Sequence, residues 1–449
     1  MRKYFLPISL LIGILLVTSC KNTGNGELIG VKRKAKVSRS DPYGMVYIPM
    51  GSFTLGTGFQ DLTGTNFVTP KTVTVSAFYM DQTEITNSEY RQFVNWVVDS
   101  FALKLLGEVE PETYLIEEDP KTGYVYDEPI LNRKAKIDWK DPEVIEALDD
   151  LFIPEHERYF GKKEIDARKL YYEYYWIDMN AAAKKDLSDP ENNTEDASFA
   201  TRPQGRRDRS VFVKKERINI YPDTLCWISD FAYSYNEPLA KYYFSHPAFD
   251  DYPVVGVNWK QARAFCIWRT NLKNDYLASQ GNAINMNEYR LPTEVEWEWA
   301  SRGGYEGNPY PWGGPYTLNE NGCYLANFKP QRGNYAADGG STTTAVASYP
   351  PNDFNLYDMA GNVAEWTIDA FDESSYNFTW DMNASYTYNA KETDPPAMKR
   401  KVIRGGSWKD VYLNLQTSTR AYEYQDTATC YIGFRCVQSF LGRQKGDKN

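Results

Sequence analysis

Histidine is almost absent from this chain, with only two, His156 and His246, among 449 residues. Neither stands in a recognisable ligand spacing, so we expect both to be ordinary surface residues. A Ser-His-Asp triad or a histidine-rich metal centre needs a histidine close to other catalytic or ligating residues. The scarcity of histidine therefore argues against both kinds of site.

The chain also lacks an excess of positive charge. It has 50 Lys and Arg against 60 Asp and Glu, a formal net charge of −10. Phosphate binding needs a basic surface, so this balance argues against a nucleic-acid partner and against a polybasic membrane contact. Cleavage after residue 19 would leave 449 − 19 = 430 residues and, because Arg2 and Lys3 are lost, a net charge of −12.

Long apolar runs are lacking except at the N-terminus. Arg2 and Lys3 precede a mostly apolar stretch over residues 4–17, which ends in V-T-S-C at Cys20. The stretch is short for a membrane span, and the V-T-S-C ending resembles a bacterial lipobox. We therefore predict a signal peptide over residues 1–19 and lipidation of Cys20; an ordinary secretory signal is the alternative. Lys21 is not an inner-membrane retention signal, so the resemblance implies an outer-membrane anchor.

Cysteines are few, and their number is odd once Cys20 is set aside. Five remain, namely Cys226, Cys266, Cys323, Cys430 and Cys436. In an oxidising compartment some of them should pair, and the odd count leaves at least one that is unpaired or intermolecular.

One sharp turn stands out, in the sequence YPPNDFNLYDMAGNVAEWTID over residues 349–369. Gly361 and Asn362 favour a tight bend, and Glu365 follows in what should be a buried segment. A buried carboxylate needs a cation, a hydrogen-bond cage or a metal. Asp358, Glu365 and the carbonyl groups of the bend are ligands of the kind that Ca²⁺ prefers. The alternative is that Glu365 pairs with an arginine.

The first part of the chain predicts strands followed by a helix. Residues 20–42 are expected to form a flexible tether, and a domain to begin at residue 43. Residues 45–56 read as strand, turn, strand, and residues 72–79 as another strand. Thr86 and Glu89 fit a capping box. The apolar face of the helix that follows is formed by Tyr90, Phe93, Val94 and Val97.

Residues 100–225 differ in composition, being dense in charge and poor in long apolar runs. We interpret them as an insertion, mostly helix and loop, with helical periodicity around Leu170, Tyr171, Tyr174, Tyr175 and Ile177. Residues 186–216 look poorly ordered by composition. The aromatic sequence YYEYYW at 171–176 is of a kind that often packs against another surface, so partner binding and a solvated segment without a function both stay open.

Regular structure returns near residue 252. We predict a strand over residues 252–257, a helix from Trp259, and a second capped helix that starts at Thr293 and ends at Gly303. Residues 305–348 should be loops. Residues 402–408 and 431–437 read as late strands, and residues 441–449 as a frayed tail. The capped, amphipathic helix also explains Glu294, Glu296 and Glu298 without acid–base catalysis.

Taken together, these segments resemble the formylglycine-generating enzyme (sulfatase-modifying) domain. The motifs stand in the family's order: MVYIPMGSFTLG, FYMDQTEITNSEY, PVVGVNWKQARAFC, RLPTEVEWEWASRGG, YPWGG, NLYDMAGNVAEW, VIRGGSW and GFRC. The resemblance implies an α+β fold over residues 43–440, rich in loops, with a C-type-lectin-like core that the insertion interrupts.

The resemblance also implies structural calcium and a disulfide. One calcium site corresponds to Asp358, Gly361, Val363 and Glu365, and the other to Asn327, Phe328, Asp338 and Gly340. Two side-chain oxygens and two carbonyls fall short of the six to eight ligands of Ca²⁺, so waters or further carbonyls must complete each shell. The implied disulfide joins Cys266 to Cys436, with Cys430 as the competing partner.

Catalysis is where the chain departs from the family. The active enzymes use two cysteines five residues apart after the GGS motif, because copper(I) capture and thiol exchange need sulfur. Those positions hold Asp410 and Leu415, and no cysteine occurs between Cys323 and Cys430. The resemblance therefore implies no enzyme activity by this route.

A lipobox, this domain, a long charged insertion and GGSWKDV together resemble one subgroup, the GldK/PorK lipoproteins of the type IX secretion and gliding machinery. That resemblance implies a ring at the periplasmic face of the outer membrane, formed by self-association and with a GldN/PorN-like partner. A non-enzymatic scaffold is the favoured function. An oxidase with relocated chemistry and a glycan- or peptidoglycan-binding module are the alternatives.

Overall fold

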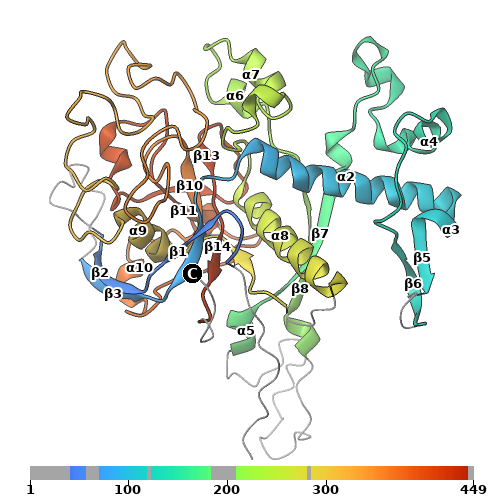
Figure 1. Cartoon of the computed structure of the whole chain (residues 1–449), viewed down its shortest axis with the longest axis horizontal. Coiled ribbons are helices and arrows are strands. Elements are labelled where there is room, and N and C mark those ends of the chain that lie inside the picture. The colour runs from blue at the N-terminus through green and yellow to red at the C-terminus, as the bar shows by residue number, and fades with distance from the viewer. Residues whose placement is uncertain (1–40, 57–69, 119–122, 184–208, 281–284, 443–449) are drawn as a thin grey trace, which may run out of the picture. The chain divides into compact units, whose positions relative to one another are not determined.

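The computed structural model describes residues 41–56, 70–118, 123–183, 209–280 and 285–442. One compact unit comprises Pro42–Phe440 (Figure 1). The helices are α2 (Asn87–Val109), α3 (Pro111–Tyr114), α4 (Pro142–Ala147), α5 (Met179–Ala183), α6 (Cys226–Ser229), α7 (Glu237–Tyr242), α8 (Trp259–Ser279), α9 (Glu294–Arg302) and α10 (Ser375–Phe378). None of the described helices is both long and apolar enough to cross a bilayer. Cys20 and most of the tether lie outside the described residues.

Within the described residues, the β structure comprises two four-stranded sheets and three two-stranded sheets. The strands are β1 (Met45–Ile48), β2 (Gly51–Leu55), β3 (Lys71–Val75), β4 (Phe78–Asp81), β5 (Leu115–Glu118), β6 (Val125–Leu131), β7 (Tyr171–Ile177), β8 (Val213–Asn219), β9 (Tyr289–Arg290), β10 (Ala364–Ala370), β11 (Arg400–Arg404), β12 (Ala421–Tyr424), β13 (Ile432–Gly433) and β14 (Val437–Ser439). The sheets have the orders β1-β4-β14-β9 and β12-β11-β10-β13, and β2-β3, β5-β6 and β7-β8 pair separately.

The C-terminal strand closes the sheet that the N-terminal strands begin. β14 pairs antiparallel with β4 and with β9. The first and last strands of the unit Pro42–Phe440 therefore belong to the same sheet. The predicted strand over residues 72–79 is two strands, β3 and β4, which belong to different sheets. The mixed α and β fold expected from the sequence is confirmed.

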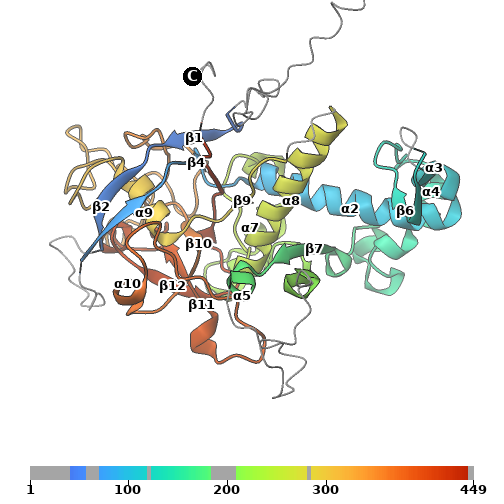
Figure 2. The ribbon, with the colours of Figure 1, turned by 90° about the horizontal axis from the view of Figure 1, so that it is seen from below.

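Helix α2 begins as predicted but continues further. The Thr86 hydroxyl accepts from the Glu89 N–H, and the Glu89 carboxylate accepts from the Thr86 N–H, which completes the capping box. The helix runs to Val109, nine residues past the expected boundary at residue 100, because Ala102, Leu103 and Leu106 extend its buried face. Figures 1 and 2 show that α3, α4, β5 and β6 lie beside the C-terminal end of α2.

The long helical insertion is not confirmed. Its aromatic segment forms strand β7, paired antiparallel with β8 in a register that sets Tyr172 opposite Ile218. Burial alternates along β7, with Tyr172 and Tyr174 buried and Tyr171 and Tyr175 exposed, which is the period of a strand. The interpretation of this segment as helical was therefore wrong. Of residues 186–216, those at 186–208 lie outside the described residues, and Val213 begins β8.

The insertion shares the main hydrophobic core with the rest of the chain. Leu148, Leu151, Tyr172 and Tyr174 belong to the same buried cluster as the residues of α2 and α8. The Tyr90 ring of α2 stacks on Phe265 of α8, with centroids 5.6 Å apart. The insertion is therefore a part of the fold that cannot be removed without exposing this core.

The glutamates of α9 form ion pairs with arginines of the same helix and of two other segments. Glu294 pairs with Arg420 at 2.5 Å, and Glu298 pairs with Arg302 and Arg404, each at 2.7 Å. These groups are almost wholly buried, and the capping box of Thr293 and Glu296 and the left-handed Gly303 bound the helix as predicted. A structural role for the α9 glutamates is thus confirmed, and it rests on ion pairs as well as on the cap.

Candidate functional site

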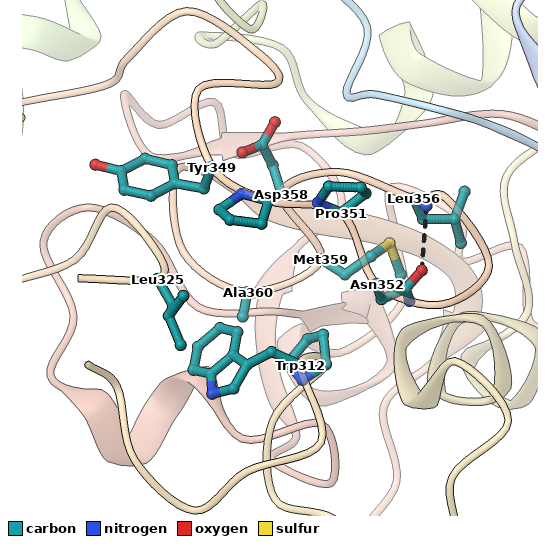
Figure 3. Close-up of a pocket in the computed structure, with 11 residues that line it drawn as sticks. Trp312, Leu325, Tyr349, Pro351, Asn352, Leu356, Asp358, Met359 and Ala360 are labelled. Carbon is teal, nitrogen blue, oxygen red and sulfur yellow. Dashed lines mark hydrogen bonds between the residues drawn. The ribbon is translucent and has the colours of Figure 1, made fainter. Parts of the chain in front are cut away.

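The turn before β10 is as sharp as the sequence indicated. Asp358, Gly361 and Asn362 all have positive φ angles, of 55°, 81° and 56°. A Cβ atom at Gly361 would lie 2.3 Å from the Asn327 carbonyl oxygen, so only glycine fits there. In Figure 3 the Asp358 carboxylate points away from Trp312, and the dashed line marks the bond from the Leu356 N–H to Asn352.

Glu365 pairs with an arginine, the alternative that the sequence left open. Arg435 donates to Glu365 Oε1 from Nη2 at 2.6 Å and to Oε2 from Nε at 2.8 Å. Trp297 Nε1 also donates to Oε2, at 2.8 Å. Both charged side chains are fully buried. The Glu365 carboxylate is therefore already well supplied with donors.

A third carboxylate, Glu84, lies at this turn and was not singled out from the sequence. It is completely buried and accepts from the Val363 N–H at 3.1 Å and from Asn362 Nδ2 at 2.6 Å. The only sequence signal was its place in FYMDQTEITNSEY, a charged residue just before a helix cap. Glu84, from the N-terminal part of the chain, therefore binds the backbone and a side chain of this turn.

The turn gathers more negative than positive charge. Burial raises the pKa of Glu84, and the nearby Asp358 and Glu365 carboxylates raise it further, although Arg435 opposes them. Burial likewise raises the pKa of Asp358 to about 6. Three carboxylates face one guanidinium, so protons or a cation must compensate the remainder.

The second predicted calcium loop brings its residues together. The Asp338 carboxylate accepts from the Phe328 N–H at 2.6 Å and from the Gly340 N–H at 3.2 Å. Asn327 is buried, and its Oδ1 has no hydrogen-bond partner among the described residues. A Cβ at Gly340 would lie 2.8 Å from that oxygen. An unpartnered buried acceptor beside a carboxylate is what a cation would satisfy.

The two loops are joined by a tyrosine. Tyr349 donates its hydroxyl to the Asp338 carbonyl oxygen at 3.0 Å, and it lies beside Asp358 in Figure 3. Its pKa is raised by burial and by the charges of Asp338 and Asp358. Within the described residues, no group of three or more His, Cys, Asp or Glu side chains converges to hold a metal ion. Calcium at either loop stays a prediction.

Asp410 and Leu415 each have a structural role, one in a turn and the other in a hydrophobic cluster. Asp410 Oδ2 accepts from the Ser407 hydroxyl at 2.6 Å and from the Ser407 N–H at 3.0 Å, which closes the turn after β11. Leu415 is fully buried in a cluster with Tyr310 and Phe328. A cavity of about 280 Å³ beside Asp410 is lined by Gly406, Lys409, Asn414, Tyr422, Glu423 and Tyr431, among others.

The predicted disulfide partners are neighbours. The sulfur atoms of Cys266, on α8, and Cys436, just before β14, lie 3.4 Å apart in a buried site. Cys430 belongs instead to a different buried cluster, which also contains Cys226. Cys323 is exposed.

The domain model "Sulfatase-modifying factor enzyme 1-like domain" matches residues 32–210 and 211–440. The chain belongs to the FGE-sulfatase family. Two similar proteins are "Inactive C-alpha-formylglycine-generating enzyme 2" of Bos taurus, 34% identical over 203 residues and covering 44% of this chain and 53% of its own, and "Formylglycine-generating enzyme" of Bos taurus, 24% identical over 408 residues and covering 90% and 76%.

The match to the inactive relatives is partial. The chain spans 53% of the Bos taurus protein and 59% of its Mus musculus counterpart, which bears the same name. Among solved structures, PvdO from Pseudomonas aeruginosa aligns with a TM-score of 0.45 and 17% identity, over 91% of this chain and 100% of PvdO. The FGE-sulfatase family thus contains both proteins named as enzymes and proteins named as inactive.

Proposed function

We propose that this FGE-sulfatase family member is a non-enzymatic assembly protein. The observation that carries the proposal is the structural role of Asp410 and Leu415, the residues that the family resemblance aligns with the cysteine pair of the active enzymes. Asp410 closes a turn through Ser407, and Leu415 fills a core. Carboxylate and alkyl groups can neither capture copper(I) nor exchange thiols. The word "Inactive" in the names of two relatives supports this proposal.

The described cysteines offer no replacement for the missing pair. Cys226, Cys266, Cys430 and Cys436 are buried, and Cys323 is exposed. Burial raises the pKa of the Cys226, Cys430 and Cys436 thiols, which disfavours the reactive thiolate. This disposition weighs against an oxidase with relocated chemistry.

The proposed setting is the type IX secretion and gliding machinery, as in the GldK/PorK lipoproteins that the sequence resembles. There the chain would be anchored to the outer membrane through Cys20, face the periplasm, and form a ring by self-association and with a GldN/PorN-like partner. The exposed aromatic residues of the insertion support an assembly role, because aromatic side chains are enriched at protein interfaces. A glycan- or peptidoglycan-binding module is the outcome that a test for partners would reveal instead.

Calcium in this proposal is structural. The loop of Asn327 and Asp338 would bind calcium more readily than the Asp358 turn, with Asn327 Oδ1 and the Asp338 carboxylate as its side-chain ligands. Asn327 Oδ1 has no other partner among the described residues. At the Asp358 turn the ion would have to share Glu365 with Arg435. Calcium would supply charge compensation and loop rigidity in either place, and no chemistry.

The proposal is tested with substitutions that keep the fold. Leu415→Ala would open a core cavity at a cost of about 2–5 kcal/mol, so Leu415→Met and Asp410→Asn are the informative changes. A strain whose only copy carries both should secrete and assemble as the wild type does. Loss of secretion by a folded, anchored variant would contradict the proposal, as would oxidation of a cysteine peptide by the purified wild-type chain with copper and oxygen.

A further inference from the structure

A large groove lies between α2, the inserted loops and α7. Its volume is about 1070 Å³, just above the range typical of ligand sites. Among its lining residues, Val94 and Val98 come from α2, Phe152 and Tyr159 from the inserted loops, and Tyr242 from α7. A groove of this size, with both apolar and polar lining residues, can receive a stretch of polypeptide several residues long.

The charge of the groove is opposite to that of the chain. Arg91, Lys162, Lys163 and Lys241 line it, against the single acid Glu164, whereas the chain carries −10 overall. Arg91 pairs with Asp250 at 2.6 Å, and Lys163 with Asp149 at 3.4 Å. Lys162 and Lys241 make no ion pair within the part of the chain that the structure describes. These two ammonium groups are available to an acidic ligand.

Two aromatic rings stand at the groove without cover. Tyr159 is 74% exposed and Phe160 is 85% exposed, and their rings pack edge to face with centroids 4.4 Å apart. Phe160 has a φ of 49°, a conformation that a bulky residue rarely adopts. The chain thus keeps a large apolar ring in water at a conformational cost, which is typical of a surface that another molecule covers.

The chain itself contains a segment of matching chemistry. Residues 186–199, DLSDPENNTEDASF, carry five acids and no base, with Leu187 and Phe199 near the ends. The segment lies outside the described residues, between α5 and β8. We propose that the groove of one copy of this chain binds the acidic segment 186–199 of a second copy. The inference rests on the assembly role proposed above and names the surface that would carry it.

This contact has a definite symmetry. The groove and the segment are different surfaces. Each copy binds the segment of one neighbour in its groove and inserts its own segment into the groove of another, which is a head-to-tail interface. Such an interface closes into a ring if the rotation allows and otherwise continues as a filament. The attraction includes exposed charges, so it should weaken as salt increases.

A mixing experiment distinguishes this contact from others. The groove variant K162E/K241E and the segment variant E191Q/E195Q/D196N, both otherwise full-length and mature, should each be monomeric. Mixed together they should form dimers and nothing larger, because only one productive contact remains. The control K391E changes an exposed lysine far along the sequence and should assemble like the wild type. Sedimentation velocity over a range of concentrations gives the readout.

A labelled peptide of residues 186–199 tests the groove directly. It should bind the wild-type chain at low salt and bind K162E/K241E about tenfold or more weakly, which corresponds to about 1.4 kcal/mol. Equal peptide binding by both chains overturns the inference, as does wild-type assembly by K162E/K241E. A monomeric wild type overturns the contact between copies even if it binds the peptide, whereas a wild type that assembles but does not bind the peptide overturns the groove assignment and leaves the proposed assembly function standing.

A second inference comes from the cysteines. Cys226 on α6 and Cys430 are both buried and belong to one cluster with Trp227, Tyr243, Val255 and Val363. Asp230 lies one helical turn after Cys226 and accepts from the Cys430 N–H at 2.9 Å. Side chains four residues apart share one face of a helix, so the contact at Asp230 places the backbone of Cys430 beside the face of α6 that carries Cys226.

The geometry points to a disulfide between Cys226 and Cys430. Its formation removes one hydrogen from each thiol, and both electrons and both protons pass to a thiol–disulfide oxidoreductase, whose own disulfide becomes two thiols. This inference rests on the proposed export from the cytoplasm. The bond would fasten α6, at the end of the insertion, to the segment before β13, and would leave Cys323 as the one unpaired cysteine of the mature chain after Cys20.

Peptide mapping tests the pairing. The full chain, isolated from its own membranes in the presence of an alkylating agent, should yield a linked peptide pair containing Cys226 and Cys430. The variant Cys323→Ser should give the same pair. Recovery of Cys226 and Cys430 as alkylated thiols, or a link from Cys430 to Cys266, overturns the inference.

Discussion

Arg435 and Glu365 form a fully buried ion pair, 2.6 Å apart. The pair connects the segment between β13 and β14 to β10, the strand that follows the Asp358 turn. Arg435 also donates to the carbonyl oxygens of Asp81 and Tyr357. One guanidinium therefore joins the end of β4, the turn and β10. The family motifs NLYDMAGNVAEW and GFRC therefore meet at this pair.

Removing one partner of this pair should be severe. Arg435→Ala leaves Glu365 charged and buried, beside Glu84 and Asp358, and should lower the free energy of unfolding by about 3–5 kcal/mol. Urea denaturation measures it. The double variant Arg435→Met/Glu365→Gln should recover part of the loss, and the exposed control Arg332→Ala should cost little. A loss below about 1 kcal/mol for Arg435→Ala would contradict the role given to the pair.

Lys401 should make stability depend on pH. It is fully buried, with its ammonium 3.8 Å from the centroid of the Trp259 ring, and burial lowers its pKa from 10.5 to about 7. Between pH 7 and 10.5 the unfolded chain therefore holds more protons than the folded one. The contribution of Lys401 to stability should therefore rise with pH across this window, by up to about 1.4 kcal/mol per pH unit.

The variant Lys401→Met isolates that effect. Its stability relative to the wild type should be highest near pH 7 and should fall as pH rises towards 10. Urea denaturation at several pH values gives the two curves, with the exposed Lys391→Met as the control that follows the wild type. Parallel curves for Lys401→Met and the wild type would mean that Lys401 titrates normally in the folded chain.

Calcium should stabilise the chain through the Asn327 loop. An ion at 100 times its dissociation constant adds about 2.7 kcal/mol to the free energy of unfolding, so EDTA should lower the melting temperature. Asp338→Asn should abolish this response, whereas the exposed control Glu320→Gln should keep it. If EDTA does not change the melting temperature of the wild type, both loops fold without the ion.

The Cys266–Cys436 pairing should also be visible in solution. The disulfide would close a loop long enough to stabilise the chain by on the order of 4–5 kcal/mol in the entropy model. Cys266→Ser should lower stability in oxidised protein and have much less effect in reduced protein. Recovery of Cys266 as a free thiol in oxidised protein would refute the pairing.

The sequence predicted local structure well wherever capping chemistry was explicit. The boxes at Thr86 and Thr293 and the left-handed Gly303 appear as expected because each is a contact between near neighbours in the chain. The segment YYEYYW misled because apolar residues at almost every position fit both a helical and a strand period. Its pairing with β8, some forty residues later, decided the outcome.

The candidate site was predicted only in its local part. The turn from Asp358 to Glu365 and the close approach of Cys266 to Cys436 could be foreseen, one from turn chemistry and the other from family resemblance. Glu84 and the arginine partner of Glu365 could not, because they come from opposite ends of the chain. Long-range ion pairs leave no periodic signal, and the same limit hid the arginine partners of α9.

The mass of the complex that this chain forms in its own membrane tests the central claim most directly. The tagged wild type, extracted from outer membranes in mild detergent, should run as an assembly of many copies together with one other protein in fixed proportion. Cys20→Ser, which lacks the lipid, should be missing from that membrane fraction. A single copy without a fixed partner in the wild-type extract would contradict the account.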